Sequence, residues 1–435
     1  MGRDLVGVLG IAVTLVLMLT GMPIAFIFCL VGFVGVIYFT SLGTAFHMAG
    51  TTFFETFSSY DLTVIPLFVL MGYFAFNSGV TQRLFDAGYK TFGQVRGGLY
   101  LGTIAASAAF AACCGSSVAG VATMGTVALP EMRRHRYADS LAGGCVAAAG
   151  SLAVLIPPSI TLVIYGILTE QSIGQLFIAG IIPGIILALL FMLAIYIITR
   201  IRPEMGPPGP PVPFKEKVSA LVFGSGEIAV LFVILMGGLF VGFFTPTEAG
   251  AVGAAAMFLI TIVRRKLGWK GFVHSVQDSL RTAAMILLII AGAGVFNGFI
   301  AYSRLPFTVA DVVGDLPLPP NVIMLLIVLV YLVLGCFMDT LAMILLTIPI
   351  FFPVSQQLGF DPIWFGVVIV VVSEMGLITP PVGIAVYVVK GVMPGVSLQT
   401  IFKGIYPFLI AEWVLIFIMI LFPEVATYLP SLMTR

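Results

Sequence analysis

The chain has 435 residues, of which 60% are hydrophobic and only 9% charged, and its formal net charge is +1. A soluble domain carries about 25% charged residues, so this composition excludes an ordinary soluble protein. The near-neutral charge gives no reason to expect a nucleic-acid partner. Many apolar runs reach the roughly 20 residues that span a bilayer, which predicts an all-α polytopic membrane protein rather than a β-barrel.

The predicted apolar segments lie at residues 5–20, 24–40, 62–79, 98–132, 140–170, 174–199, 218–243, 247–263, 281–303, 320–354, 362–388 and 405–422. The first is expected to be retained rather than cleaved as a signal peptide, because no strongly basic start precedes it and Pro23 leads directly into the next run. Two segments are interrupted by short polar motifs, "CCGSS" at 113–117 and "GCFMDT" at 335–340.

The positive charges predict how the segments are oriented, because Lys and Arg favour the cytoplasmic side. Basic residues flank segment 98–132 at both ends, so it is expected to enter and return as a re-entrant hairpin. Segment 320–354 has mostly acidic flanks and is expected to be a hairpin entered from outside. This predicts about ten transmembrane helices plus two hairpins, with both termini outside. Two full spans in place of a hairpin would leave the sidedness unchanged, so charge does not separate these alternatives.

The two halves of the chain align with one another. Three proline pairs share a separation of 223 residues: Pro130 with Pro353, Pro157 with Pro380, and Pro158 with Pro381. The same offset places Ser116 on Asp339. An odd number of predicted spans separates the hairpins, so the repeats have opposite orientations. Inverted repeats with broken helices are typical of secondary transporters.

The repeat predicts four regions. They are N-terminal scaffold helices (1–79), a first repeat (80–200, hairpin 98–132 and broken helix 140–170), a connector with central scaffold helices (201–275), and a second repeat (276–435, hairpin 320–354 and broken helix 362–388). The stretch "PEMGPPGPPVP" (203–213) is expected to be a semi-rigid cytoplasmic connector. A docking site for a partner is the alternative.

Each half carries a proline pair inside an apolar run, "LIPPS" (155–159) and "LITPPVG" (377–383). Proline removes a backbone donor and breaks a helix, which leaves carbonyls at one end of the break and N–H groups at the other. Carbonyls can hold a cation such as Na⁺, and helix N-termini can hold an anion. The alternative is a purely structural role, in which the prolines only kink packed helices. Two breaks at one spacing, each in a half with a polar hairpin tip, favour a pair of ion sites.

The hairpin tips supply candidate side chains. Ser116 and Ser117 are expected to open a helix as an N-cap, which leaves other backbone groups for an ion. Asp339 and Thr340 are expected to do the same in the second half. An ionisable residue at membrane depth is a functional hypothesis by default, so Asp339 is the first candidate.

Other charged residues leave alternatives open. Glu374 lies just before the second break and is either a coupling or a structural carboxylate. Arg304 either snorkels to the interface or clamps a carboxylate substrate. Glu227 and Glu248 are expected to face a helix-bundle interface. The five cysteines lack metal-site spacing, and no nucleophile–base pair is visible, so we do not expect an enzyme.

Five stretches together resemble the large membrane (permease) subunit of TRAP (tripartite ATP-independent periplasmic) transporters. They are "GSSVAGVATMG" (115–125), "LIPPS" (155–159), "TPTEAGAVGA" (245–254), "CFMDTLAMILLTIP" (336–349) and "GLITPPVG" (376–383). The resemblance covers essentially the whole chain. It implies a sodium-driven, elevator-type importer of organic acids in the bacterial inner membrane. It also implies two partners, a small membrane subunit of about four helices on a separate chain and a periplasmic substrate-binding protein.

The resemblance also implies about two sodium sites, the coupling ion being the only cofactor expected. The residues it assigns to sodium are Ser116, Ser117, Pro157, Pro158 and Ser159 in the first half, and Gly335, Asp339, Thr340, Gly376, Thr379 and Pro380 in the second. Substrate contact is assigned to Arg304, Asp339 and Ser116. Many members of the family that the chain resembles carry an asparagine near Val372; this chain lacks it, so no contribution from that position is expected here.

The sequence therefore predicts Na⁺-coupled import of a carboxylate by a protein whose hairpins and broken helices move against a scaffold. One alternative is a stand-alone Na⁺- or H⁺-coupled anion symporter that needs no binding protein. Another is a membrane scaffold that does not transport.

Overall fold

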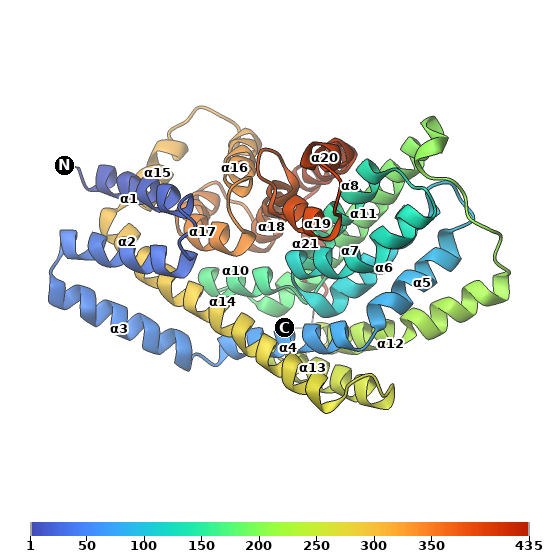
Figure 1. Cartoon of the computed structure of the whole chain (residues 1–435). Helices are drawn as coiled ribbons and strands as arrows, with labels where there is room; N and C mark the ends of the chain where they lie inside the picture. The colour runs from blue at the N-terminus through green and yellow to red at the C-terminus, as the bar shows by residue number, and fades with distance from the viewer. Residues whose placement is uncertain (1, 434–435) are drawn as a thin grey trace.

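The computed structural model describes residues 2–433, and every regular element in that range is a helix. The N-terminal helices are α1 (Arg3–Met18), α2 (Ile24–Phe39), α3 (Leu42–Ser58), α4 (Val64–Asn77) and α5 (Val80–Phe92). Central helices α12 (Phe214–Phe240), α13 (Pro246–Val263), α14 (Trp269–Ser303) and α15 (Leu305–Gly314) follow the first repeat. Figure 1 shows α14 crossing the molecule beneath the bundle, and it packs against α2, α3 and α4.

The two repeats have the same order of elements. The first contains the hairpin α6 (Gly98–Cys114) and α7 (Ser117–Arg134), the broken helix α8 (Asp139–Ala149), α9 (Leu152–Leu155) and α10 (Ile160–Thr169), and then α11 (Ile173–Ile201). The second contains the hairpin α16 (Pro320–Gly335) and α17 (Thr340–Gln357), the broken helix α18 (Pro362–Ile378) and α19 (Ile384–Val392), and then α20 (Leu398–Leu421) with α21 (Glu424–Ser431).

The repeats exchange parts in a symmetrical way. Helix α10 of the first repeat packs against the second hairpin helix α17, and α19 of the second repeat packs against the first hairpin helix α7. In each repeat, the part of the broken helix that follows the break therefore packs against the hairpin of the other repeat. The prediction of an all-helical repeat protein is confirmed.

Length and hydropathy identify helices that can cross a membrane. Among residues 2–433, six helices are long and apolar enough, and eight spans result if each bent pair counts as one. Helices α2, α6, α16 and α18 are apolar but have only 10–17 residues. Of these, α2 and α18 were expected to be spans and are not counted, because they fall short of the roughly 20 residues that a perpendicular span needs, whereas α6 and α16 are arms of the two hairpins.

The structure has helices that the hydropathy pattern did not predict. Helix α3 occupies a stretch expected to be a connection, and it begins where the Ser41 hydroxyl accepts a hydrogen bond from the Thr44 N–H at 3.2 Å. Helix α15 was also unexpected, and α14 begins at Trp269 rather than near residue 281. The expected region boundary at 275/276 therefore falls within one continuous helix. A search for long apolar runs misses α3 and the start of α14 because they are more polar, and it misses α15 because that apolar helix has only ten residues.

The proline-rich connector is packed onto the first repeat. Tyr100 donates a hydrogen bond to the Met205 carbonyl at 2.9 Å, and Tyr137 donates one to the Pro207 carbonyl at 2.9 Å. Burial raises the pKa of Tyr137, so its hydroxyl remains a donor at neutral pH. The connector is thus tied to the loop between α7 and α8 instead of being a free linker.

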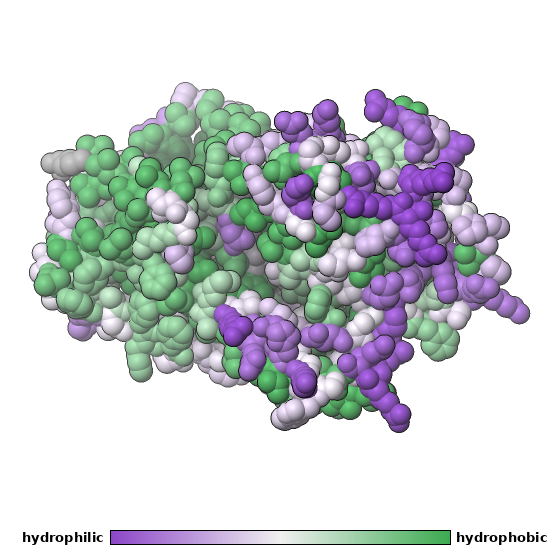
Figure 2. Space-filling model, viewed as in Figure 1, coloured by the Kyte–Doolittle hydropathy of each residue, from purple (hydrophilic) through white to green (hydrophobic). Residues whose placement is uncertain are grey.

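Figure 2 shows hydrophilic residues gathered over one part of the molecule, where Figure 1 places the connector between α11 and α12. The surface over α1, α2 and α3 is mostly hydrophobic. Many large apolar side chains are exposed on these N-terminal helices, including Leu19 at 74% and Phe54 at 74%. Such a surface suits contact with lipid or with another membrane helix.

Candidate functional site: two hairpin tips, two helix breaks and a shared cavity

The first hairpin tip touches the first helix break. Gly115 lies between α6 and α7 with φ of +62°, and a Cβ atom placed on it would come within 2.9 Å of the Pro158 carbonyl oxygen. Glycine at this position permits both the left-handed turn and the close approach. Ser116 caps α7 by accepting a hydrogen bond from the Ala119 N–H at 3.5 Å, and Ser159 caps α10 in the same way from Leu162 at 3.3 Å. The expected cap at the hairpin tip is present and is formed by Ser116, while the cap at the break, Ser159, was not predicted.

The second hairpin tip touches the second break by a different pair of contacts. A Cβ atom on Gly335 would lie 2.9 Å from the Gly376 Cα, so the two backbones meet where only glycine fits. The Cys336 thiol lies 3.3 Å from the Pro380 carbonyl oxygen, to which it donates. Asp339 caps α17 by accepting from the Leu341 N–H at 3.2 Å. The predicted pairing of each tip with its own break is therefore observed in both halves.

The two breaks differ in exposure. Pro157, Pro158 and Ser159 are buried, whereas Thr379 and Pro380 are half-buried and the following Pro381 is exposed. The peptide bond between the two prolines is cis in both breaks. The Thr379 hydroxyl donates to the Met375 carbonyl at 2.6 Å.

Glu374 is connected to the second hairpin tip. The Thr340 hydroxyl donates a hydrogen bond of 2.8 Å to Glu374 Oε1, and the two residues are 3% and 2% exposed. A buried carboxylate needs such partners, because an unpaired charge in an apolar interior is costly. The contact joins the start of α17 to the last turns of α18.

A cavity of about 540 Å³ lies where the two tips meet the scaffold. The first tip contributes Ser116 and Ser117, and the second contributes Asp339 and Thr340, with Glu374 beside them. The opposite wall comes from α4 and α14 and is formed by Val69, Gly72, Tyr73, Phe76, Thr282, Met285 and Ile286. In the described part of the chain, the residues that line the cavity include two carboxylates and no Lys, Arg or His.

Arg304 is not part of this cavity. It follows α14 in the left-handed conformation, with φ of +59°, and its side chain is exposed. The structure therefore brings Ser116 and Asp339 together and leaves the third residue expected to contact substrate elsewhere.

Two features of the site were missed from the sequence. Tyr73 and Thr282 face the cavity from α4 and α14, and their hydroxyl oxygens lie 2.9 Å apart. No local pattern predicts a contact between residues so far apart in the chain. Glu412 in α20 is fully buried, and both its carboxylate oxygens lack a hydrogen-bond partner among the described residues. A carboxylate within an apolar segment was the available signal for Glu412.

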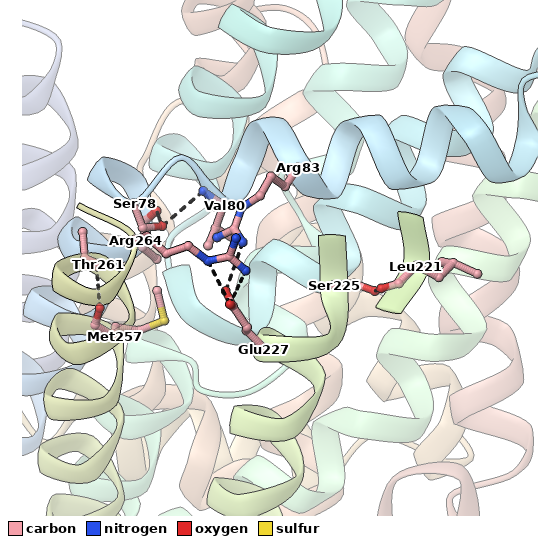
Figure 3. A network of polar contacts seen from close by, with 10 residues as sticks. Ser78, Val80, Arg83, Leu221, Ser225, Glu227, Met257, Thr261 and Arg264 are labelled. Carbon is pink, nitrogen blue, oxygen red and sulfur yellow. Dashed lines mark hydrogen bonds and ion pairs between the residues drawn. The ribbon is translucent and has the colours of Figure 1, made fainter. Parts of the chain in front are cut away.

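Away from the cavity, Glu227 of α12 joins two arginines (Figure 3). Arg83 of α5 lies 3.1 Å from Glu227 Oε2, and Arg264 at the end of α13 pairs with Oε1. Glu227 thus faces a helix interface, as expected. Glu248 does not: it is exposed and completes a capping box with Thr245 at the start of α13. The expectation for Glu248 is wrong because its position in the first helical turn satisfies free backbone N–H groups.

An all-helical membrane fold with two hairpin tips and two broken helices around a cavity defines a polytopic membrane transporter. The chain belongs to the family "Tripartite ATP-independent periplasmic transporter, DctM component", which it matches over residues 11–425.

The chain is similar along most of its length to individual members of that family. It is 38% identical over 379 residues to the C4-dicarboxylate TRAP transporter large permease protein DctM of Pseudomonas aeruginosa, covering 87% of this chain and 88% of that one. It is 34% identical over 417 residues to the sialic acid TRAP transporter large permease protein SiaM of Vibrio cholerae, covering 96% of each. Among solved structures, the YdaH transporter of Alcanivorax borkumensis has a similar fold, with a TM-score of 0.65, 15% identity and coverage of 87% and 88%.

Proposed function

We propose that this chain is the large permease subunit of a sodium-coupled importer of an organic acid in the bacterial inner membrane. Its partners in the proposal are a small membrane subunit and a periplasmic substrate-binding protein, consistent with the family's tripartite description. The two relatives described above are named for C4-dicarboxylate and for sialic acid, which are both carboxylates.

One observation carries the coupling-ion part of the proposal. Within residues 2–433, the cavity is lined by Asp339 and Glu374 and by no basic side chain. An anionic substrate would lie beside these two carboxyl groups with no basic side chain to balance its charge, and where the carboxyl groups are ionised, like charges at short range in a low-dielectric site repel strongly. Cations bound at the tip-and-break contacts would offset that repulsion. Each sodium ion carried inward across 100 mV would also contribute about 2.3 kcal/mol of driving force.

The proposed mechanism is an elevator. The hairpins and broken helices form a transport domain, which moves against a scaffold that includes α2, α4, α13 and α14. The cavity lies between these two groups of helices, so a substrate held there would contact both. At the boundary, Gly72 of α4 lies close to the first hairpin: a Cβ atom placed on it would come within 3.3 Å of the carbonyl oxygens of Cys113 and Cys114.

The test is the melting temperature of the purified full-length chain in NaCl, with KCl and choline chloride at matched ionic strength as controls. A ligand that binds only the folded state stabilises it by about 2.7 kcal/mol at a hundredfold excess over Kd. We expect a saturable rise with Na⁺ alone. Asp339→Asn retains a good N-cap residue and removes the charge, so it separates an ion role from a capping role. The same dependence of melting temperature on concentration in all three salts would contradict specific sodium binding.

A further inference from the structure

The cavity has two chemically different walls. The transport-domain wall contains the carboxyl groups of Asp339 and Glu374 and the hydroxyls of Ser116, Ser117 and Thr340, and these polar groups lie among apolar side chains such as Phe110, Val118 and Leu341. The scaffold wall contains Val69, Phe76, Met285 and Ile286. A ligand that fills the cavity must therefore present a polar end to one wall and an apolar body to the other.

The scaffold wall offers little to a charged or strongly polar group. Its polar side chains are Tyr73 and Thr282, whose hydroxyl oxygens lie 2.9 Å apart and hydrogen-bond to one another. Arg281 is the neighbour of Thr282 on α14, but its side chain is 82% exposed and lies 3.9 Å from Asp278 on the same helix. Arg281 does not line the cavity.

We infer that the substrate is an organic acid with a single carboxylate and an apolar body. This inference rests on the proposed function, since it assigns the carboxylate to the cation-binding wall. A second ionised carboxylate would be pressed against Phe76 and Met285 with no cation beside it, and an unpaired buried charge is costly. A polyhydroxylated body would lose hydrogen bonds to water along the same wall and recover few of them. The chain would therefore discriminate against the two substrate types for which the relatives described above are named.

Three acids test the inference with the full-length chain in NaCl. We would compare binding of 4-methylpentanoate, which has one charge and an apolar body, with succinate, which has two charges, and with gluconate, which has one charge and a hydroxylated body. Isothermal titration gives each Kd. We expect 4-methylpentanoate to bind at least tenfold more tightly than either other acid.

Substitutions in the scaffold wall sharpen the comparison. Met285→Lys places an ammonium group in this wall, because Met285 is 56% exposed and lines the cavity. We expect it to shift the preference at least tenfold toward succinate. Leu280→Lys is the matched control, since Leu280 lies on the same helix, is 61% exposed and does not line the cavity. Phe76→Ser is a second variant, and it is expected to reduce the ratio between the Kd values of gluconate and 4-methylpentanoate.

The outcomes separate this inference from the proposed function. Tighter binding of succinate or gluconate by the unmodified chain would overturn the substrate class, whatever sodium does. A sodium-dependent melting temperature with no binding of 4-methylpentanoate would overturn it as well, while leaving sodium binding intact. Selective binding of 4-methylpentanoate that is equal in NaCl and KCl would support the substrate class and count against sodium coupling.

Discussion

The Thr340 hydroxyl and the Glu374 carboxylate form a buried hydrogen bond of 2.8 Å. Thr340 begins α17 of the second hairpin, and Glu374 lies near the end of α18, just before the second helix break. Asp339, the neighbour of Thr340, lines the same cavity. This bond therefore fixes a carboxylate of the broken helix relative to the hairpin tip.

Replacing Thr340 tests the importance of this bond. Thr340→Val keeps the shape of the side chain and removes the donor, which leaves Glu374 Oε1 buried without this partner. We expect the free energy of unfolding to fall by about 1–3 kcal/mol. Thr340→Ser retains the hydroxyl and should be much closer to the unmodified chain in a thermal unfolding experiment. Equal losses for the two variants would show that the methyl group, and not the hydrogen bond, matters.

Replacing Glu412 is expected to stabilise the folded protein, in contrast to replacing Thr340 by valine. Its carboxylate is 0% exposed and has no hydrogen-bond partner in the described part of the chain. Glu412→Met removes this unsatisfied group at similar volume, so we expect stabilisation on the order of 1–3 kcal/mol. Glu374→Met removes the acceptor used by Thr340 and should destabilise. A lower melting temperature for Glu412→Met would mean that Glu412 has a stabilising partner, such as a bound ion.

The contact between α8 and α20 depends on glycine. A Cβ atom on Gly404 would lie 1.8 Å from the Ser140 carbonyl oxygen, and one on Gly144 would lie 2.2 Å from the Gly404 carbonyl oxygen. Gly404→Ala must separate the helices, and we expect a loss of about 1–3 kcal/mol or more. Gly391→Ala in α19 is the control, because nothing lies within 4 Å of its Cβ position. The two variants should differ clearly in chemical or thermal unfolding.

The ion-pair cluster at Glu227 predicts a modest, salt-dependent effect. Glu227 is about one-third exposed, at 32%, and its partners Arg83 and Arg264 are 23% and 37% exposed. A double-mutant cycle of Arg83→Gln with Glu227→Gln should give a coupling of about 0.2–1 kcal/mol, because such pairs remain partly solvated. The coupling should decrease from low to high salt as the charges are screened. A coupling that does not change with salt would argue for a buried network instead.

The sequence by itself determined the membrane class, most of the helices, the repeat and the positions of both helix breaks. These features are local or periodic. Hydropathy follows from composition, and a proline pair breaks a helix because it removes backbone donors, wherever the segment lies. Caps at Ser116 and Asp339 were predicted for the same reason, because an N-cap acts on backbone groups two or three residues away.

The tertiary structure alone decided which residues meet. Glu374 lines the cavity and bonds to Thr340, while Arg304 lies apart from it. Tyr73 and Thr282 form a hydrogen bond although they are far apart in sequence. They belong to α4 and α14, and these two helices also form the apolar cavity wall on which the substrate inference rests. Close approaches such as Gly335 with Gly376 depend on how whole helices pack. Such packing is set by the complementary shapes of surfaces that come together only in the fold, so no local pattern in the sequence reports it.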